Sequence, residues 1–290
     1  MHPASSLIYF TVASGFGFGF LFFLGLGMPA LTGANAFWSY FIGYFLAVSG
    51  LMSSVLHLGN KVNAVKAMSQ WRSSWLSREG VFAILTLVTF APVAITQIWD
   101  GPNFSLVGYL GSFLAIITIY CTAMIYGQLK TVPRWNQHIT PFLFLAFGIT
   151  GGAIIAQQDQ IAAIGLPVLL ILQIGHWVIG DRSWSSGLDT AESATGLGGS
   201  TGTVRLLERP HTGKNYLTTE MVHLVGRKHS DRLRGLVVLG LLLCVLGSIF
   251  IAPISLLVWL LPLVFAALIS RWLFFAEAEH VVGLYYGRAK

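Results

Sequence analysis

Residues 6–28 read SLIYFTVASGFGFGFLFFLGLGM, a run of apolar and small residues without a single charged side chain. A helix of about 20 apolar residues crosses a bilayer core, so this segment is long enough to span one. Glycines recur along it, and in lipid they more often permit close helix packing than flexibility. The run has neither the charged start nor the cleavage site of a signal peptide, so we expect it to be retained as a transmembrane helix.

The composition of the whole chain also indicates a membrane protein. Its 290 residues are 55% hydrophobic and 10% charged, with a mean hydropathy of +0.72, whereas soluble domains carry about 25% charged residues. The apolar runs are continuous rather than alternating, which favours helices over a β-barrel. We therefore predict an all-α integral membrane protein, a single domain built as a bundle of eight transmembrane helices. The predicted spans lie near 6–28, 37–57, 80–99, 104–127, 140–157, 160–180, 233–252 and 254–275.

Basic residues are distributed unevenly between the predicted loops. Of 17 lysines and arginines, 16 follow spans two, four, six and eight, and the last, Arg271, lies near the same end of span eight. The loops after the odd-numbered spans carry only Asp100 and Asp159 as charges. Because Lys and Arg are enriched in cytoplasmic loops, we predict that both termini and all basic loops face the cytoplasm.

Two function classes are disfavoured by the same pattern. The net charge of +6 could suggest nucleic-acid binding, but these charges lie between spans and report topology instead. Cys121 and Cys244 lie inside apolar runs with no CxxC or Cys/His spacing, so neither a disulfide framework nor a metal site is predicted.

One long loop, residues 182–232, separates spans six and seven. Its first part, 185–202, is rich in Gly, Ser and Thr and is typical of a flexible linker. Its later part is basic, and residues 219–229 could form an amphipathic helix. Two interpretations stay open: the loop fixes topology by its charge, or it provides a docking surface for a cytoplasmic partner.

Ionisable residues at membrane depth are expensive and are therefore functional candidates. His57 ends span two within the sequence LHLG (56–59), and Glu79 opens span three within SRE (77–79). An imidazole beside a carboxylate could transfer protons to and from a quinone, which takes up two protons with two electrons. In the alternative interpretation, Glu79 only complements the helix start behind a Ser77 cap, and His57 donates to a backbone carbonyl.

Other polar residues lie near the cytoplasmic ends of later spans. His176, one turn before the end of span six, could pair with His57 as a haem ligand, although a buried, hydrogen-bonded histidine is the commoner case. Trp135 suits an interfacial anchor. A polar group at the end of span eight could line a headgroup pocket or bind a partner, or could be an interfacial belt of snorkelling side chains. This group consists of Arg271, Glu277, Glu279 and His280.

The motifs LHLG (56–59), SRE (77–79) and TVPRW (131–135), in this order across eight spans, resemble the membrane-anchor subunits of the dimethyl sulfoxide reductase family. The resemblance covers essentially the whole chain. It implies an anchor for an iron–sulfur subunit and a molybdopterin catalytic subunit, which exchanges electrons with ubiquinone or menaquinone and has no haem of its own. It also implies a quinone-site role for His57 and Glu79. Arg271 and His280 are our further candidates for quinone binding or proton transfer.

A second resemblance narrows the assignment. Residues 205–218, RLLERPHTGKNYLT, look like the long cytoplasmic loop in the anchor subunits of the cytoplasmic membrane-bound sulfite dehydrogenase. Reductase anchors have the equivalent face in the periplasm, whereas the charge distribution here places it in the cytoplasm. The resemblance therefore implies sulfite oxidation on a partner at the cytoplasmic face of a bacterial inner membrane, with quinone reduced in this non-catalytic subunit. The predicted docking residues are Arg205, Arg209, His211, Lys214 and Tyr216.

Three alternatives remain open from the sequence. The chain could anchor a dimethyl sulfoxide reductase-like complex that oxidises quinol, or it could be a cytochrome that carries haem. It could also be a transporter or channel, but a secondary transporter should show repeat symmetry and helices interrupted at the midplane. No convincing repeat is present, and the ionisable residues gather at one membrane edge.

Overall fold

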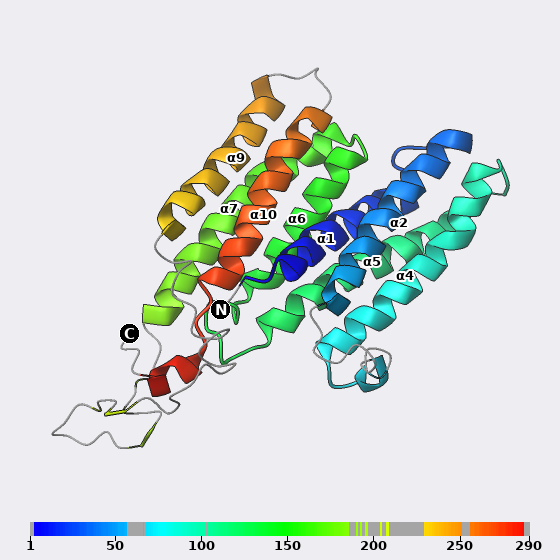
Figure 1. Ribbon diagram of the computed structural model, residues 1–290. Coiled ribbons are helices and arrows are strands. Elements are labelled where there is room, and N and C mark those ends of the chain that lie inside the picture. Colours follow the sequence, from blue (N-terminus) through cyan, green and yellow to red (C-terminus); the bar gives the residue numbers. More distant parts are fainter. Residues whose placement is uncertain are drawn as a thin grey trace.

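The computed structural model describes residues 3–56, 66, 68–102, 104–185, 190, 192, 195–196, 204, 207–208, 229–250 and 256–286 (Figure 1). This part of the chain contains eight α-helices and no strand, which confirms the all-α prediction for these residues. The α-helices are α1 (Ser5–Gly25), α2 (Gly33–Leu56), α4 (Trp75–Ile98), α5 (Ser105–Gly127), α6 (Ile139–Ile155), α7 (Asp159–Ser185), α9 (Ser230–Phe250) and α10 (Leu260–Ala276). Short 3-10 helices cover Met68–Gln70, Leu256–Trp259 and Val281–Tyr286.

Six of these helices are long and apolar enough to cross a membrane, namely α1, α2, α4, α5, α7 and α9. The other two, α6 and α10, have 17 residues each. Two helix starts differ from the sequence prediction. The third helix begins at Trp75 because the Ser74 side chain accepts a hydrogen bond from the Ser77 amide and caps it. The last helix begins at Leu260, so that Pro262 falls in its first turn, where no amide hydrogen is needed.

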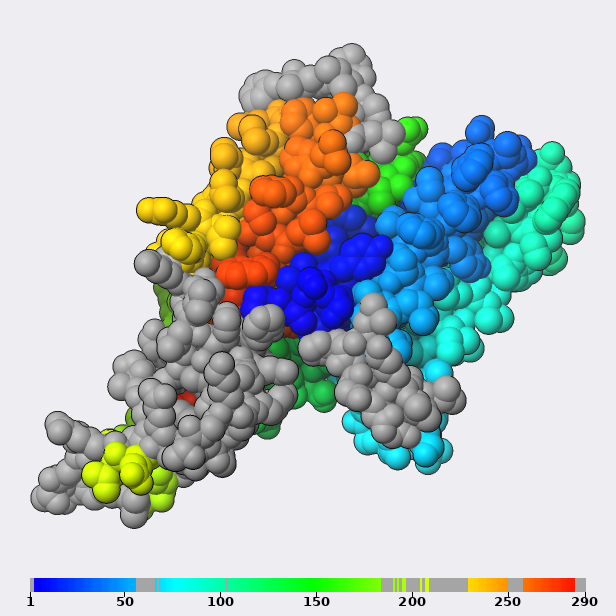
Figure 2. Space-filling view, viewed as in Figure 1, coloured from blue at the N-terminus to red at the C-terminus, as the bar shows by residue number. Residues whose placement is uncertain are grey.

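Helix α1 lies in the middle of the bundle. It contacts α2 and α5 on one side, and α6 and α10 on the other. Figure 1 shows the resulting two halves, one formed by α2, α4 and α5 and the other by α6, α7, α9 and α10. In the space-filling view, α9 and α10 lie side by side on one flank of α1, and α2 and α4 lie on its other flank (Figure 2).

The glycines of α1 are the points where neighbouring helices come closest. A Cβ atom on Gly17 would overlap the backbone of Ala47 in α2, and one on Gly19 would overlap the carbonyl of Gly148 in α6. Gly25 meets the backbone of α5 at Gly108 in the same way. These three contacts confirm that the glycines serve close packing, since one small helix surface has to receive three different helices.

The charged residues separate between the two ends of the bundle. The described lysines and arginines lie at or near the end where α2, α5, α7 and α10 finish and α4, α6 and α9 start, which we call the basic end. Asp100 and Asp159 lie at the opposite end. The helices therefore bring together at one end the basic residues that are dispersed along the sequence. They are Lys66, Arg72, Arg78, Lys130, Arg134, Arg182, Arg232, Arg234 and Arg271.

Candidate functional site

Glu79 is a buried acid in the second turn of α4, close to the basic end. Its side chain is 3% exposed, and its Oε1 lies 2.5 Å from the Thr122 hydroxyl of α5. The first turn of α4 contains no acidic residue, and Ser74 rather than Ser77 is the cap. The interpretation of Glu79 as a simple helix-start charge is therefore wrong, because this carboxyl group faces α5 inside the bundle.

The hydrogen bonds of Thr122 let Glu79 exist in two protonation states. The Thr122 hydroxyl is also 3.1 Å from the Thr118 carbonyl oxygen, but it has only one hydrogen to donate. When Glu79 is ionised, the hydroxyl donates to its carboxylate. When Glu79 is protonated, its O–H donates to the Thr122 oxygen, and the hydroxyl turns to Thr118. Neither state leaves a buried group at this contact without a partner, so the site is suited to gaining and losing a proton.

Further polar groups surround this contact. A cavity of about 10 Å³ lies beside Thr122 and is also lined by Thr11 and Ser14 of α1. That volume holds about one water molecule. On the other side, the hydroxyls of Thr86 and Thr118 lie 3.1 Å apart, so the polar contacts continue along the α4–α5 interface. The predicted partner of Glu79, His57, lies outside the described residues, and their proximity stays a prediction.

The segment before α4 is held against the helix start by Arg78. Its guanidinium donates from Nε to the Trp71 carbonyl at 3.0 Å and from Nη2 to the Arg72 carbonyl at 2.6 Å. It also stacks 4.3 Å above the ring of Trp75. Two backbone carbonyls and an aromatic ring thus fix this basic residue, and the loop that precedes Glu79 is shaped by it.

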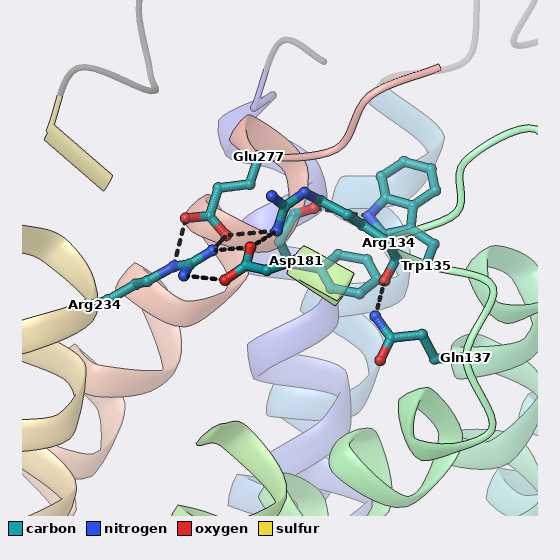
Figure 3. Close-up of polar contacts among 7 residues, drawn as sticks. Arg134, Trp135, Gln137, Asp181, Arg234 and Glu277 are labelled. Carbon is teal, nitrogen blue, oxygen red and sulfur yellow. Dashed lines mark hydrogen bonds and ion pairs between the residues drawn. The ribbon is translucent and has the colours of Figure 1, made fainter. Parts of the chain in front are cut away.

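A second polar site joins four elements at the basic end, as Figure 3 shows. Arg134, in the loop between α5 and α6, donates to Asp181 of α7 at 2.5 Å. Arg234 of α9 donates to both oxygens of Asp181, at 2.8 and 3.0 Å, and to both oxygens of Glu277 after α10, again at 2.8 and 3.0 Å. We call these four residues the ion cluster. Paired Arg–carboxylate bonds of this kind fix orientation as well as distance.

Among the members of the ion cluster, only Glu277 is a candidate site residue predicted from the sequence. Arg134 enters that prediction only as a topology signal, and Asp181 and Arg234 are not paired in it. A signal is nonetheless available, because the end of span six, the start of span seven and the end of span eight must meet at the same membrane face. One acid or base at each of these three helix ends predicts an ion pair between them.

Trp135 is expected from the sequence as an interfacial anchor, and this prediction is wrong. Its ring is buried and stacks on Phe274 of α10, with 5.3 Å between ring centroids. Its Nε1 donates to the Phe274 carbonyl at 2.7 Å. Burial of a tryptophan requires such a partner for its N–H, and the end of α10 supplies it. The TVPRW turn (131–135) is therefore a packing element of the core.

The polar group predicted at the end of span eight is divided by the structure. Arg271 is 2% exposed, and its guanidinium carbon lies 3.6 Å from the ring centroid of Phe144. Its Nη1 has no hydrogen-bond partner among the described residues, so Arg271 does not snorkel to the interface as one interpretation held. His280 lies beyond the helix, where its Nδ1 accepts from the Val282 amide at 3.1 Å. Burial lowers the pKa of His280.

His176 lies below the ion cluster, on the side of α7 that faces α10. Its ring is 5% exposed and lies 5.6 Å from the ring of Phe274. The interpretation as a buried histidine is confirmed, but the expected hydrogen bonds are missing from the described part of the chain, since neither ring nitrogen has a partner there. The predicted docking residues Arg205, Arg209, His211, Lys214 and Tyr216 lie outside the described residues, and their role stays a prediction.

Fold and sites together define a multi-pass membrane protein whose polar groups gather at one end of a helical bundle. The chain belongs to the family described as DMSO reductase anchor subunit (DmsC), which matches residues 1–277. It is 31% identical to a sulfite dehydrogenase subunit from Allochromatium vinosum over 334 residues, which cover 99% of each chain. No solved structure matches it. The family resemblance drawn from the three motifs is thereby confirmed.

Proposed function

We propose that this chain is the quinone-reactive membrane anchor of an oxidoreductase complex and passes electrons from sulfite oxidation to the quinone pool. The observation that carries the proposal is the similarity to a sulfite dehydrogenase subunit along the entire chain. In this proposal, a molybdopterin subunit oxidises sulfite to sulfate and releases two electrons. An iron–sulfur subunit then conducts them to the cytoplasmic face of a bacterial inner membrane. Two electrons are what one quinone needs to become a quinol.

The proposed quinone site lies at the basic end, around Glu79 and His57. Glu79 supports the proposal because its contact with Thr122 is satisfied whether the acid is protonated or ionised. It is also close to the end where a cytoplasmic partner would deliver electrons. Arg271 is the second candidate for the headgroup, because its buried guanidinium carries a donor that is unpaired within the described part of the chain. Such a donor can stabilise the negative charge that develops on a quinone oxygen during reduction.

The family name favours one alternative, an anchor that oxidises quinol for a dimethyl sulfoxide reductase-like complex. Purification of the intact complex from membranes separates the two. We expect sulfite to reduce a soluble quinone analogue, with molybdenum and iron–sulfur clusters present in the copurifying subunits. Quinol oxidation coupled to sulfoxide reduction, without activity toward sulfite, would establish the alternative instead.

The proposed topology has eight spans with both termini in the cytoplasm. A green fluorescent protein fused after Lys290 is expected to fluoresce, and alkaline phosphatase at the same position is expected to be inactive. The physical reason is the retention of basic loops on the cytoplasmic side. As a control, alkaline phosphatase inserted after Pro102, at the opposite end of the bundle, should be active. Activity of the fusion at Lys290 would contradict the topology.

The proposed docking loop can be tested by deletion. Removal of residues 203–218 should release the catalytic partners into the soluble fraction, because these residues supply docking surface but no span. A matched control removes 186–201, an equal length from the Gly/Ser/Thr-rich linker, and should leave the partners on the membrane. The measurement is the distribution of sulfite-oxidising activity between membrane and soluble fractions. Equal distribution in the two deletions would show that docking does not depend on 203–218.

A further inference from the structure

A line of polar side chains runs inward from the ion cluster between α7 and α10. Gln173, His176 and Asp181 lie on one side of α7, and Ser270 and Glu277 lie on the facing side of α10. At the inner end, the Ser270 hydroxyl donates to the Gln173 side chain at 2.7 Å and joins the two helices. The eight residues from Gln173 to Asp181 correspond to about 12 Å of helix, so the line extends far below the basic end.

His176 occupies the middle of this line beside a small cavity. Both of its ring nitrogens are buried and have no hydrogen-bond partner in the described part of the chain. The cavity has a volume of about 10 Å³, and Gln173, Ser270 and Glu277 line it together with His176. That is room for about one water molecule. Because unpaired buried nitrogens cost free energy, a water bound to His176 at this polar site is strongly favoured.

The outer end of the cavity reaches the ion cluster. Arg134 and Glu277 belong to the cluster and also line the cavity. The side chain of Asp181 is 44% exposed, so the cluster also contacts the surroundings of the basic end. Gly180 leaves space at this point, since a Cβ atom there would lie 2.9 Å from Nε2 of Gln137. A continuous set of polar groups therefore leads from the exterior to His176.

We propose that His176, its cavity and the ion cluster form a proton-input path in the half of the bundle that does not contain Glu79. The path rests on the proposed function, because it would supply one of the two protons that a quinone takes up. Its inner end approaches the Glu79 site around Tyr126. The ring of Phe274 lies 5.6 Å from His176 and 5.5 Å from Tyr126, and Tyr126 lies one helical turn beyond Thr122 on α5.

The proton balance of this path is simple. A quinone, two electrons from the iron–sulfur partner and two protons give one quinol, and His176 passes on every proton that it receives. Charged groups on all sides act on its ring: Arg134 of the loop, Asp181 of α7, Arg234 of α9, and Arg271 and Glu277 of α10, while α6 carries none. Three cations against two anions favour the neutral imidazole. A neutral imidazole can accept a proton at one nitrogen and donate at the other.

The test replaces His176 by Gln in the intact complex. Glutamine keeps polar atoms beside the cavity but does not titrate, so quinone-linked activity should fall about tenfold or more relative to activity with an artificial soluble acceptor. The matched control is Leu273→Met, a substitution of similar volume in the wall of the same cavity, which should leave this ratio unchanged. A ratio that is unchanged in His176→Gln, or lowered equally in Leu273→Met, would overturn the proposal.

A second variant separates proton transfer from packing. His176→Ala opens space in which imidazole itself can bind, so added imidazole should restore much of the quinone-linked activity. A purely structural role predicts no restoration, and that result would also overturn the path. The wild-type complex keeps this test distinct from the proposed function. If the wild type reduces no quinone, the proposed function fails, whereas normal wild-type activity with insensitive His176 variants removes only the path.

Discussion

Electron transfer to quinone is expected to fall about tenfold or more when Glu79 is replaced by Gln, while activity with an artificial soluble acceptor is preserved. General acid–base groups typically contribute about 10² to 10⁴ in rate, so this is a conservative expectation. The glutamine amide can donate to the Thr122 oxygen as the protonated acid does, and the helix cap at Ser74 is untouched. The variant should therefore assemble normally. The measurement is the ratio of the two activities in membranes that contain equal amounts of complex.

The control for this experiment lies two turns further along α4. Thr86→Val removes a buried hydroxyl from the same α4–α5 interface without changing any titratable group. Thr118 keeps its bond to the Leu114 carbonyl at 2.9 Å, so no buried donor is left unpaired, and the ratio should stay at the wild-type value. His57→Ala should lower the ratio and weaken the binding of quinone analogues. If Glu79→Gln and His57→Ala both behave like Thr86→Val, the quinone site lies elsewhere, first of all near Arg271.

The second large effect is expected from Gly19→Val, which should prevent stable assembly of the bundle. A Cβ atom at this position would overlap the carbonyl of Gly148, and Gly152 of α6 packs against the backbone of Gly19 itself. Both obstacles are backbone, so a side-chain rearrangement cannot remove the clash. We expect a loss of at least about 3 kcal/mol of stability, because inserting atoms into a well-packed core commonly costs about 1–3 kcal/mol even where side chains can move.

The measurement for Gly19→Val is the amount of monodisperse protein that survives detergent extraction and mild heating. Gly15→Ala provides the control on the same helix, because nothing lies within 4 Å of a Cβ atom at Gly15. This control should behave like the wild type. Equal survival of the two variants would show that α1 and α6 do not meet as closely as the structure indicates.

The sequence alone determined the class of fold, the approximate helix positions and the family. Long apolar runs leave only helices as a structure that satisfies the backbone in lipid, so element type followed from composition. The motifs LHLG (56–59), SRE (77–79) and TVPRW (131–135) determined the family because they combine residue identity with order along the chain. The number of spans and the cytoplasmic termini also came from the sequence, and they remain predictions that the fusion experiment tests.

Only the tertiary structure decided which polar residues meet. Sequence reasoning grouped Arg271 with Glu277 and His280 because they are neighbours in the chain. The structure instead places Arg271 on Phe144, Glu277 in the ion cluster and His280 beside the amide of Val282. Helical periodicity turns close neighbours to different sides, so proximity in sequence near a helix end does not predict contact.

The environment of Glu79 was likewise decided by packing between helices. The sequence identified this acid as a functional candidate at membrane depth, but it could not indicate that Thr122, 43 residues later, is its partner. It also gave no sign that the ring nitrogens of His176 lie beside a cavity without a partner among the described residues. Such features depend on the rotation of each helix about its axis. That rotation is set by contacts such as Gly19 against Gly148, which arise only once all the helices are packed together.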